Sequence, residues 1–234
     1  MIGTIINFFA ILIGGFLGLF WGSRLPEKMR KTIMVGLGLF TLVIGIQMFL
    51  LTKNSIIVLI SIIIGIVLGE WWQLEDKLHR LGLWFERHFA RRETLDDNRF
   101  VKGFLSASLV FCIGPMAILG AIQDGLSGNY QTLIIKSALD AFGAMAFAAL
   151  LGVGVLFSSV ITLVFQGTIS LLAAQAQLFV SLAMQNEMAA TGGVILTAIA
   201  IGGILEIRPI RSGNFLPAIF IAPLVVMIFN YFGI

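Results

Sequence analysis

Charged residues are scarce in this chain: only 12% of its 234 residues are Asp, Glu, Lys or Arg, while 59% are hydrophobic. Soluble domains carry about 25% charged residues, so the chain has too few polar residues to cover a water-facing surface. Apolar runs close to the ~20 residues that cross a bilayer recur along nearly its whole length. We therefore expect an all-α fold, a polytopic transmembrane helical bundle that forms a single membrane domain over residues 1–234.

Cysteine and histidine are also nearly missing. Cys112 is the single cysteine, which excludes an intramolecular disulfide and a multi-cysteine metal site; we interpret it as a buried structural thiol. The two histidines, His79 and His88, are nine residues apart, which is not a helical ligand spacing. The sequence lacks the metalloprotease, serine-hydrolase, P-loop and dinucleotide-binding motifs. We expect no enzyme activity, no metal site and no cofactor.

The apolar runs predict about eight membrane spans, at residues 2–21, 33–51, 55–70, 103–123, 132–157, 159–183, 191–207 and 214–233. Thirteen of the 15 Lys and Arg fall on alternate connections, 22–32, 71–102 and 208–213. The opposite connections, 52–54, 124–131 and 184–190, carry only Lys53. Basic connections stay in the cytoplasm, so we expect both termini outside it. This bias explains the net charge of +3 without a nucleic-acid partner.

Residues 132–183 leave two interpretations open. The two spans predicted there are joined by little more than Ser158-Ser159, which allows a tight turn or one broken helix. An odd number of spans would place Arg208 and Arg211 outside the cytoplasm, so we keep the even number.

One long polar segment, 72–92, has the pattern of an interfacial amphipathic helix. Its apolar residues recur every three or four positions, and Lys and Arg lie between them: Leu74, Leu78, Leu81, Phe85 and Phe89 form the stripe. Such a basic helix beside a span is typical of an anchor on the inner leaflet, attracted to anionic lipid. The alternative is a regulatory partner site.

Five blocks of the sequence resemble a known family. They are GTIINFFAILIGG, LGEWWQLEDKL, FCIGPMAILGAIQDGL, IKSALDAFGAMAFAALLGVGV and GGVILTAIAIGGILEIRPIRSGNFLPAI. The chain resembles the YdfK/YqgA family of bacterial inner-membrane proteins of unknown function over essentially its whole length. The resemblance implies a bacterial plasma membrane and supplies no substrate. Glu206 stands where an uncharged residue is expected, so no family role is carried onto it.

Asp140 is the most informative polar residue, because a carboxylate near the middle of a span is costly unless paired or hydrated. It lies eight residues past Thr132, about 12 Å along a helix. Lys136 precedes it by four residues and lies on the same helix face. The pair is either an ion, proton or substrate site or a tie between helices.

The central segment FCIGPMAILGAIQDGL contains a second candidate. Pro115, after Gly114, breaks the helix near mid-depth, where freed carbonyls must be buried in protein or line a water-filled cavity. Broken spans of this kind coordinate ions in transporters, although a proline kink is also a packing device. Gln123 and Asp124 are expected at the outer surface, where Asp124 either lines a mouth or caps the turn before Gly125.

Small and polar residues inside the spans predict helix contacts. Gly14, Gly18 and Gly22 form a stripe for close packing, within one chain or between protomers of a homo-oligomer. Several amides are expected to hydrogen-bond between helices: Asn7, Gln47, Gln166, Gln175 and Gln177. Short similarities between spans 1–3 and 6–8 suggest an inverted repeat, as in secondary transporters.

Two functions follow as hypotheses. The first is a gradient-driven or passive transporter or channel for a small ion or polar solute, which uses Asp140, Lys136 and the Gly114-Pro115 break, with Gln123 and Asp124 at its outer mouth. The second is a non-transporting scaffold or sensor that acts through its cytoplasmic amphipathic helix, where Arg87, Arg91 and Arg92 would matter. A polar cavity at Asp140 favours the first hypothesis, and a dry, paired Asp140 favours the second.

Overall fold

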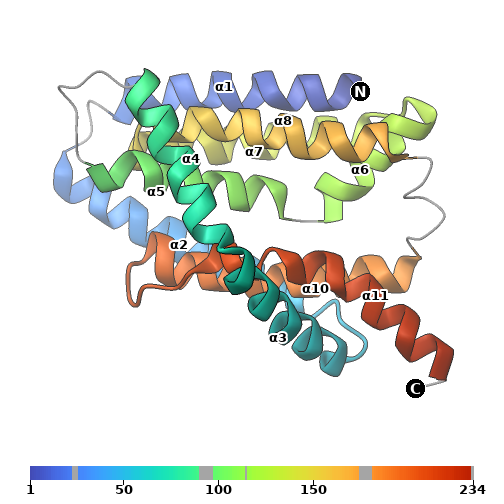
Figure 1. The fold of residues 1–234 in the computed structure, drawn as a ribbon. Helices are drawn as coiled ribbons and strands as arrows, with labels where there is room; N and C mark the ends of the chain where they lie inside the picture. The colour runs from blue at the N-terminus through green and yellow to red at the C-terminus, as the bar shows by residue number, and fades with distance from the viewer. Residues whose placement is uncertain (23–25, 90–96, 114, 174–180, 233–234) are drawn as a thin grey trace. The chain divides into compact units, whose positions relative to one another are not determined.

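The computed structural model describes residues 1–22, 26–89, 97–113, 115–173 and 181–232 (Figure 1). All regular structure in these ranges is helical. The helices are α1 (Ile2–Gly22), α2 (Glu27–Phe49), α3 (Ser55–Trp72), α4 (Leu74–Phe89), α5 (Asp97–Cys112), α6 (Pro115–Ser127), α7 (Gln131–Leu151), α8 (Gly154–Leu171), α10 (Leu182–Ile199), the π-helix η2 (Ala200–Ile204), the 3-10 helix η3 (Ser212–Phe215) and α11 (Pro217–Phe232).

Seven helices of the described ranges are long and apolar enough to cross a membrane, or eight if the bent pair α5 and α6 forms one span. With the bent pair counted as one span, these spans correspond in order to the eight predicted runs. α1 shows the surface that such a helix needs: Phe9, Ile13, Phe16 and Phe20 are each more than half exposed along one face. An exposed apolar face of this kind is unfavourable in water but suits contact with the acyl chains of lipids. The all-α polytopic fold is therefore confirmed.

Local residue choice explains several helix ends. Asn54 caps α3, because its side chain accepts a hydrogen bond from the Ile56 N–H. Gln73 then ends α3 in the left-handed region at φ 52° and separates it from α4. Gly152 ends α7 at φ 87°, a conformation that costs glycine little. The guanidinium of Arg99 caps α7 with two hydrogen bonds to the Leu150 carbonyl, at 2.8 and 3.1 Å.

Two predicted boundaries are wrong. The joint between α7 and α8 lies at Gly152-Val153 rather than at Ser158-Ser159, so the described residues of 132–173 form two separate helices. Ser158 and Ser159 lie inside α8, where their hydroxyls donate to backbone carbonyls three residues earlier, each at 2.6 Å. The predicted connection 184–190 is helical, because α10 already begins at Leu182.

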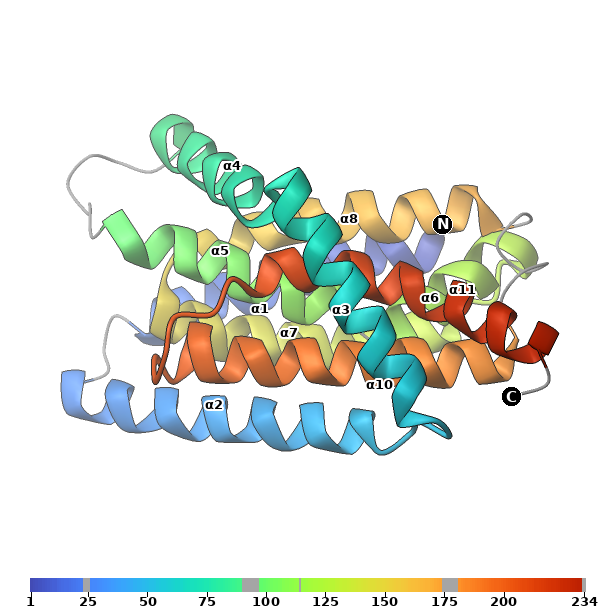
Figure 2. The same cartoon turned by 60° about the horizontal axis from the view of Figure 1, so that its bottom comes forward.

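The chain divides into two compact units. Unit 1 comprises Met1–Leu37, Leu78–Cys112 and Met116–Leu178, and unit 2 comprises Gly38–Lys77, Ile113–Pro115 and Phe179–Ile234. In unit 1, α1 lies alongside α7 and α8, and α5 packs on α8 (Figure 1). In unit 2, α3 crosses α11, and α10 packs beside α11 (Figure 2). The predicted single membrane domain and the inverted repeat stay predictions.

The glycine stripe of α1 packs against α7 of the same chain. A Cβ at Gly14 or Gly18 would collide with the carbonyl oxygen of Ala141 or Met145. At Gly22 it would lie 2.5 Å from Ala149. Of the two alternatives for this stripe, the contact within one chain is the one present, and a homo-oligomer gains no support from it.

Part of the apolar stripe of α4 packs against protein. Leu81 and Phe85 pack against Phe104 of α5 and Phe157 of α8, within unit 1. The opposite face carries the exposed Arg80, Trp84, Arg87 and His88. The amphipathic helix is therefore present, Leu81 and Phe85 on its apolar side take part in helix packing, and the anchor on the inner leaflet stays a prediction.

Candidate functional site

The candidate site of unit 1 begins with an ion pair inside α7. Lys136 and Asp140 are one helical turn apart, and the Lys136 ammonium donates to Oδ2 of Asp140. The two side chains are only 8% and 10% exposed. Asp140 is the tenth of the 21 residues of α7, so the pair lies in the middle part of a span. Lys136 neutralises the carboxylate that would otherwise be buried alone.

Two amides from other helices extend this ion pair. Asn7 of α1 donates through Nδ2 to Asp140 Oδ2 at 3.0 Å and to Gln166 Oε1 of α8 at 3.2 Å. Both amide residues are completely buried. Three spans therefore meet in one polar network, which we call the Asp140 network: Lys136, Asp140, Asn7 and Gln166. The network forms because the few polar groups on these apolar helices can hydrogen-bond only with one another.

The Asp140 network is incompletely bonded. Asn7 Oδ1 and Gln166 Nε2 are buried and have no hydrogen-bond partner within the described structure. A buried polar atom without a partner costs about 1–3 kcal/mol, so two in one network call for an explanation. The acceptor and the donor belong to the two amides that already bond each other through their other atoms.

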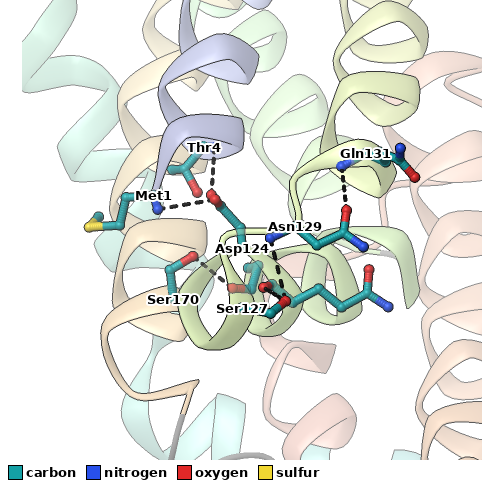
Figure 3. A network of polar contacts seen from close by, with 9 residues as sticks. Met1, Thr4, Asp124, Ser127, Asn129, Gln131 and Ser170 are labelled. Atoms are coloured by element: carbon teal, nitrogen blue, oxygen red, sulfur yellow. Dashed lines mark hydrogen bonds and ion pairs between the residues drawn. The ribbon is translucent and has the colours of Figure 1, made fainter.

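Asp124 lies in a separate network at the end of α6 (Figure 3). Its Oδ1 lies 3.1 Å from the Met1 ammonium, and its Oδ2 accepts from the Thr4 N–H at 3.3 Å. Asp124 is 3% exposed, so the expectation of a solvated carboxylate at an outer mouth is wrong. The N-terminal end of a helix carries free N–H groups and a positive partial charge, and Asp124 caps α1 through them.

Other contacts fasten α6 from both sides. The Ser170 hydroxyl of α8 donates to the Ala121 carbonyl at 2.8 Å (Figure 3). Gln123 is exposed, and its Oε1 accepts from the Thr132 hydroxyl at 2.8 Å. Gln123 and Asp124 thus face different surroundings, and neither joins the Asp140 network.

The expected helix break is present. α5 ends at Cys112, α6 begins at Pro115, and their axes differ by 61°; Gly114 lies outside the described residues. Proline is favoured at this first position, where its missing N–H costs nothing. The hydrogen-bond partners of Asp140 in the described ranges are Lys136 and Asn7, and a role of the break beside Asp140 stays a prediction.

Comparison with known proteins identifies the family of this chain. The family model described as "Protein of unknown function (DUF554)" matches residues 2–227. The chain belongs to this family. It is 31% identical over 223 residues to "Uncharacterized protein YqgA" of Escherichia coli (strain K12), covering 95% of this chain and 94% of that protein. It is 26% identical over 238 residues to "Uncharacterized membrane protein YdfK" of Bacillus subtilis (strain 168), covering 100% and 99%. No solved structure matches.

These matches confirm the family resemblance and the membrane assignment of this DUF554 chain. The names of both relatives state no activity.

In unit 2 of the DUF554 chain, sequence analysis missed a buried carboxylate. Glu187 of α10 is 3% exposed and accepts from the Thr52 hydroxyl at 2.6 Å and from the Lys53 N–H at 2.8 Å. It ties the connection before α3 to α10. The prediction of a loop at 184–190 concealed it. The useful signal was Ser181, whose side chain caps α10 by accepting from the Met184 N–H.

Two of the blocks that carry the family resemblance meet in unit 2. Arg211 pairs with Glu70 of α3, at 3.2 Å, and with Asp76. The hydrogen bond to Asp76 raises the pKa of Arg211 above its ordinary value. Asn214 accepts from the Glu75 N–H at 2.7 Å. These contacts tie the start of α4 to the segment before α11.

Proposed function

We propose that this DUF554 protein moves a small ion or polar solute across a bacterial plasma membrane, passively or driven by a gradient. The Asp140 network is the observation that carries this proposal. Ionisable residues inside spans are rare and mark ion or substrate pathways by default. Because the network joins three helices through one carboxylate, a change in what the carboxylate binds can shift the positions of these helices.

The bacterial location and the orientation are part of the proposal. Both relatives come from bacteria, and the bias of Lys and Arg favours termini outside the cytoplasm. This orientation requires α5 and α6 to count as one bent span.

A flux assay on reconstituted protein tests the transport proposal. Liposomes with the wild-type chain are given gradients of Na⁺, K⁺, Cl⁻ or H⁺, and fluorescent indicators follow each ion. We expect flux of at least one ion and a loss of more than tenfold in Asp140→Asn, which keeps the shape and removes the charge. Glu27→Gln, an exposed carboxylate on α2, is the matched control and should keep wild-type flux.

Two outcomes decide between the parts of this proposal. Unchanged flux in Asp140→Asn would remove this carboxylate from the mechanism. Wild-type liposomes as tight as empty ones to all four ions would argue against ion transport as a whole.

A non-transporting scaffold or sensor is the second candidate, and the pairing of Asp140 favours it. The carboxylate is buried and neutralised by Lys136, as a helix tie would be. In that case Asp140→Asn is tolerated, and charge reversal on the exposed face of α4 at Arg87 abolishes the activity. Arg91 and Arg92, named with Arg87 from the sequence, lie outside the described residues. Under either candidate, absence of enzyme activity stays a prediction.

A further inference from the structure

We propose that the exposed face of α4 binds the phosphate headgroup of an anionic phospholipid through Arg80 and Arg87, with Trp84 between them. This inference is independent of the proposed transport function. It also differs from an anchor that inserts its apolar stripe into the leaflet, because the binding groups lie on the opposite side of the helix.

The contacts of α4 show that it lies near the ends of two spans (Figure 1). Phe85 packs against Phe104 and Phe157, with ring centroids 5.7 and 5.2 Å apart. Phe104 is the eighth residue of α5 and Phe157 the fourth of α8, about 10.5 and 4.5 Å from the starts of these helices. The bonds from Arg99 to Leu150 hold the start of α5 level with the end of α7. α4 therefore crosses unit 1 close to one boundary of its spans.

The end of α1 shows that this boundary is the membrane–water interface. Gly22, the last residue of α1, lies against Ala149 near the end of α7, and the preceding Trp21 is 52% exposed. Trp84 of α4 is 48% exposed. Exposed tryptophans at the ends of spans are typical of this interface, where the indole ring lies at the level of the headgroups. The exposed face of α4 is therefore at headgroup depth.

The charged side chains on this face are positive. Within residues 78–88, the exposed Arg and Lys side chains are Arg80 and Arg87, and the single acidic residue, Glu86, is only 5% exposed. The two arginines are seven residues apart, which is two helical turns, so they lie on one stripe about 10.5 Å apart. Guanidinium groups bind phosphate oxygens through paired hydrogen bonds. The face is thus complementary to an anionic phosphate.

Trp84 favours a phospholipid over a soluble anion. Its ring packs against that of His88, with centroids 4.6 Å apart, which helps to hold the indole at the surface between the two arginines. An indole has a large apolar body and one polar N–H group. A phospholipid satisfies both kinds of group, because its phosphate meets the guanidinium groups and its acyl chains meet the ring. A soluble phosphate has nothing apolar to offer the ring.

Brominated lipids test this contact, because bromine quenches the fluorescence of an indole that it touches. The parent variant combines Trp21→Phe, Trp71→Phe and Trp72→Phe, which leaves Trp84 as its single tryptophan. The full-length parent is reconstituted in phosphatidylcholine bilayers that contain a fixed fraction of brominated phosphatidylglycerol or of brominated phosphatidylcholine. We expect phosphatidylglycerol to bind beside Trp84 about fivefold more tightly or better, the contribution of one basic side chain near an anionic surface.

A charge-matched pair of variants separates a site from general surface charge. Arg80→Gln combined with Arg87→Gln, in the parent, should remove the preference for phosphatidylglycerol. Lys28→Gln combined with Lys31→Gln removes the same charge from exposed positions of α2 and should keep the preference. An equal loss in both double variants would contradict a site on α4.

The parent variant decides the proposal even if the arginine variant fails to fold. Equal quenching of Trp84 by the two brominated lipids would show that the face does not select anionic lipid, and the proposal is then overturned. Quenching by neither lipid would place Trp84 in water or against a soluble partner, which also overturns it.

Discussion

Three of the four buried Asp and Glu side chains in the described ranges bond partners on other helices or connections. Asp140 bonds Lys136 and Asn7 in unit 1, and Asp124, also in unit 1, caps the start of α1. In unit 2, Glu187 bonds the connection before α3. The three differ in one respect that matters for function: the Asp140 network joins a second charged side chain and leaves amide atoms unbonded.

Removing Lys136 alone should destabilise the protein strongly. Lys136→Met leaves a buried carboxylate without its counter-charge, and breaking a buried pair from one side costs about 3–5 kcal/mol. The double variant Lys136→Met with Asp140→Leu should recover most of this loss, because it removes both charges. Unfolding by SDS in mixed micelles measures the three free energies. Equal stability of the single variant and the wild type would contradict a buried ion pair.

Sequence alone predicted the pair but not the network. Lys136 and Asp140 are four residues apart, and helical geometry brings such side chains together. Asn7 and Gln166 were predicted to form interhelical hydrogen bonds, but Asn7 lies 133 residues from Asp140 and 159 residues from Gln166. Which polar residues bond each other depends on which helices pack together. The spacing of polar residues along the sequence does not encode this packing.

Among the elements, α1 has two faces of opposite character. Its glycines approach α7 closely, and its large apolar side chains point outward. Because the backbone of α1 comes so near, the short side chain of Asn7 can reach Asp140. The glycine stripe thus positions the polar network.

Gly18→Ala tests this packing against a matched control. A Cβ at Gly18 would collide with the Met145 carbonyl, whereas one at Gly36 of α2 meets nothing within 4 Å. We expect Gly18→Ala to cost about 1–3 kcal/mol through overpacking and Gly36→Ala to be neutral or to stabilise by up to about 1 kcal/mol. Thermal unfolding of both variants measures the difference. Equal midpoints would show that α1 and α7 separate easily at Gly18.

Helix boundaries show where sequence patterns mislead. Ser158-Ser159 interrupts an apolar run like a turn, but both hydroxyls are satisfied inside α8. The real joint, at Gly152, lies in a stretch as apolar as the spans beside it and differs only by its positive φ. The predicted connection at 184–190 was wrong for a different reason. The charge of Glu187 is satisfied inside α10 by a connection far away in the sequence.

On the scale of the whole molecule, the orientation depends on the bent pair. If α5 and α6 cross as one span, eight crossings place both termini on one side. If the pair is re-entrant, seven crossings reverse everything after it. Loop charge favours the first arrangement, because it keeps Arg208 and Arg211 in the cytoplasm.

Single-cysteine labelling in intact cells distinguishes these arrangements. Lys53→Cys, Asn129→Cys, Arg87→Cys and Arg208→Cys lie at exposed positions, and the native Cys112 is only 7% exposed. A membrane-impermeant maleimide should label the first two and spare the last two. A re-entrant pair predicts the reverse at Asn129 and Arg208 while Lys53 and Arg87 keep their pattern, so these two positions carry the test.

The long separation between Asn7 and its partners also has a consequence for biogenesis. A ribosome adds about 5–20 residues per second, so roughly 7–27 s pass between synthesis of Asn7 and of Asp140, which lies 133 residues later. During this interval α1 must wait in the membrane with its glycine stripe and a polar amide uncovered. α1 is therefore made well before the helices it packs against, and its glycine stripe and Asn7 stay without these partners until α7 and α8 are made.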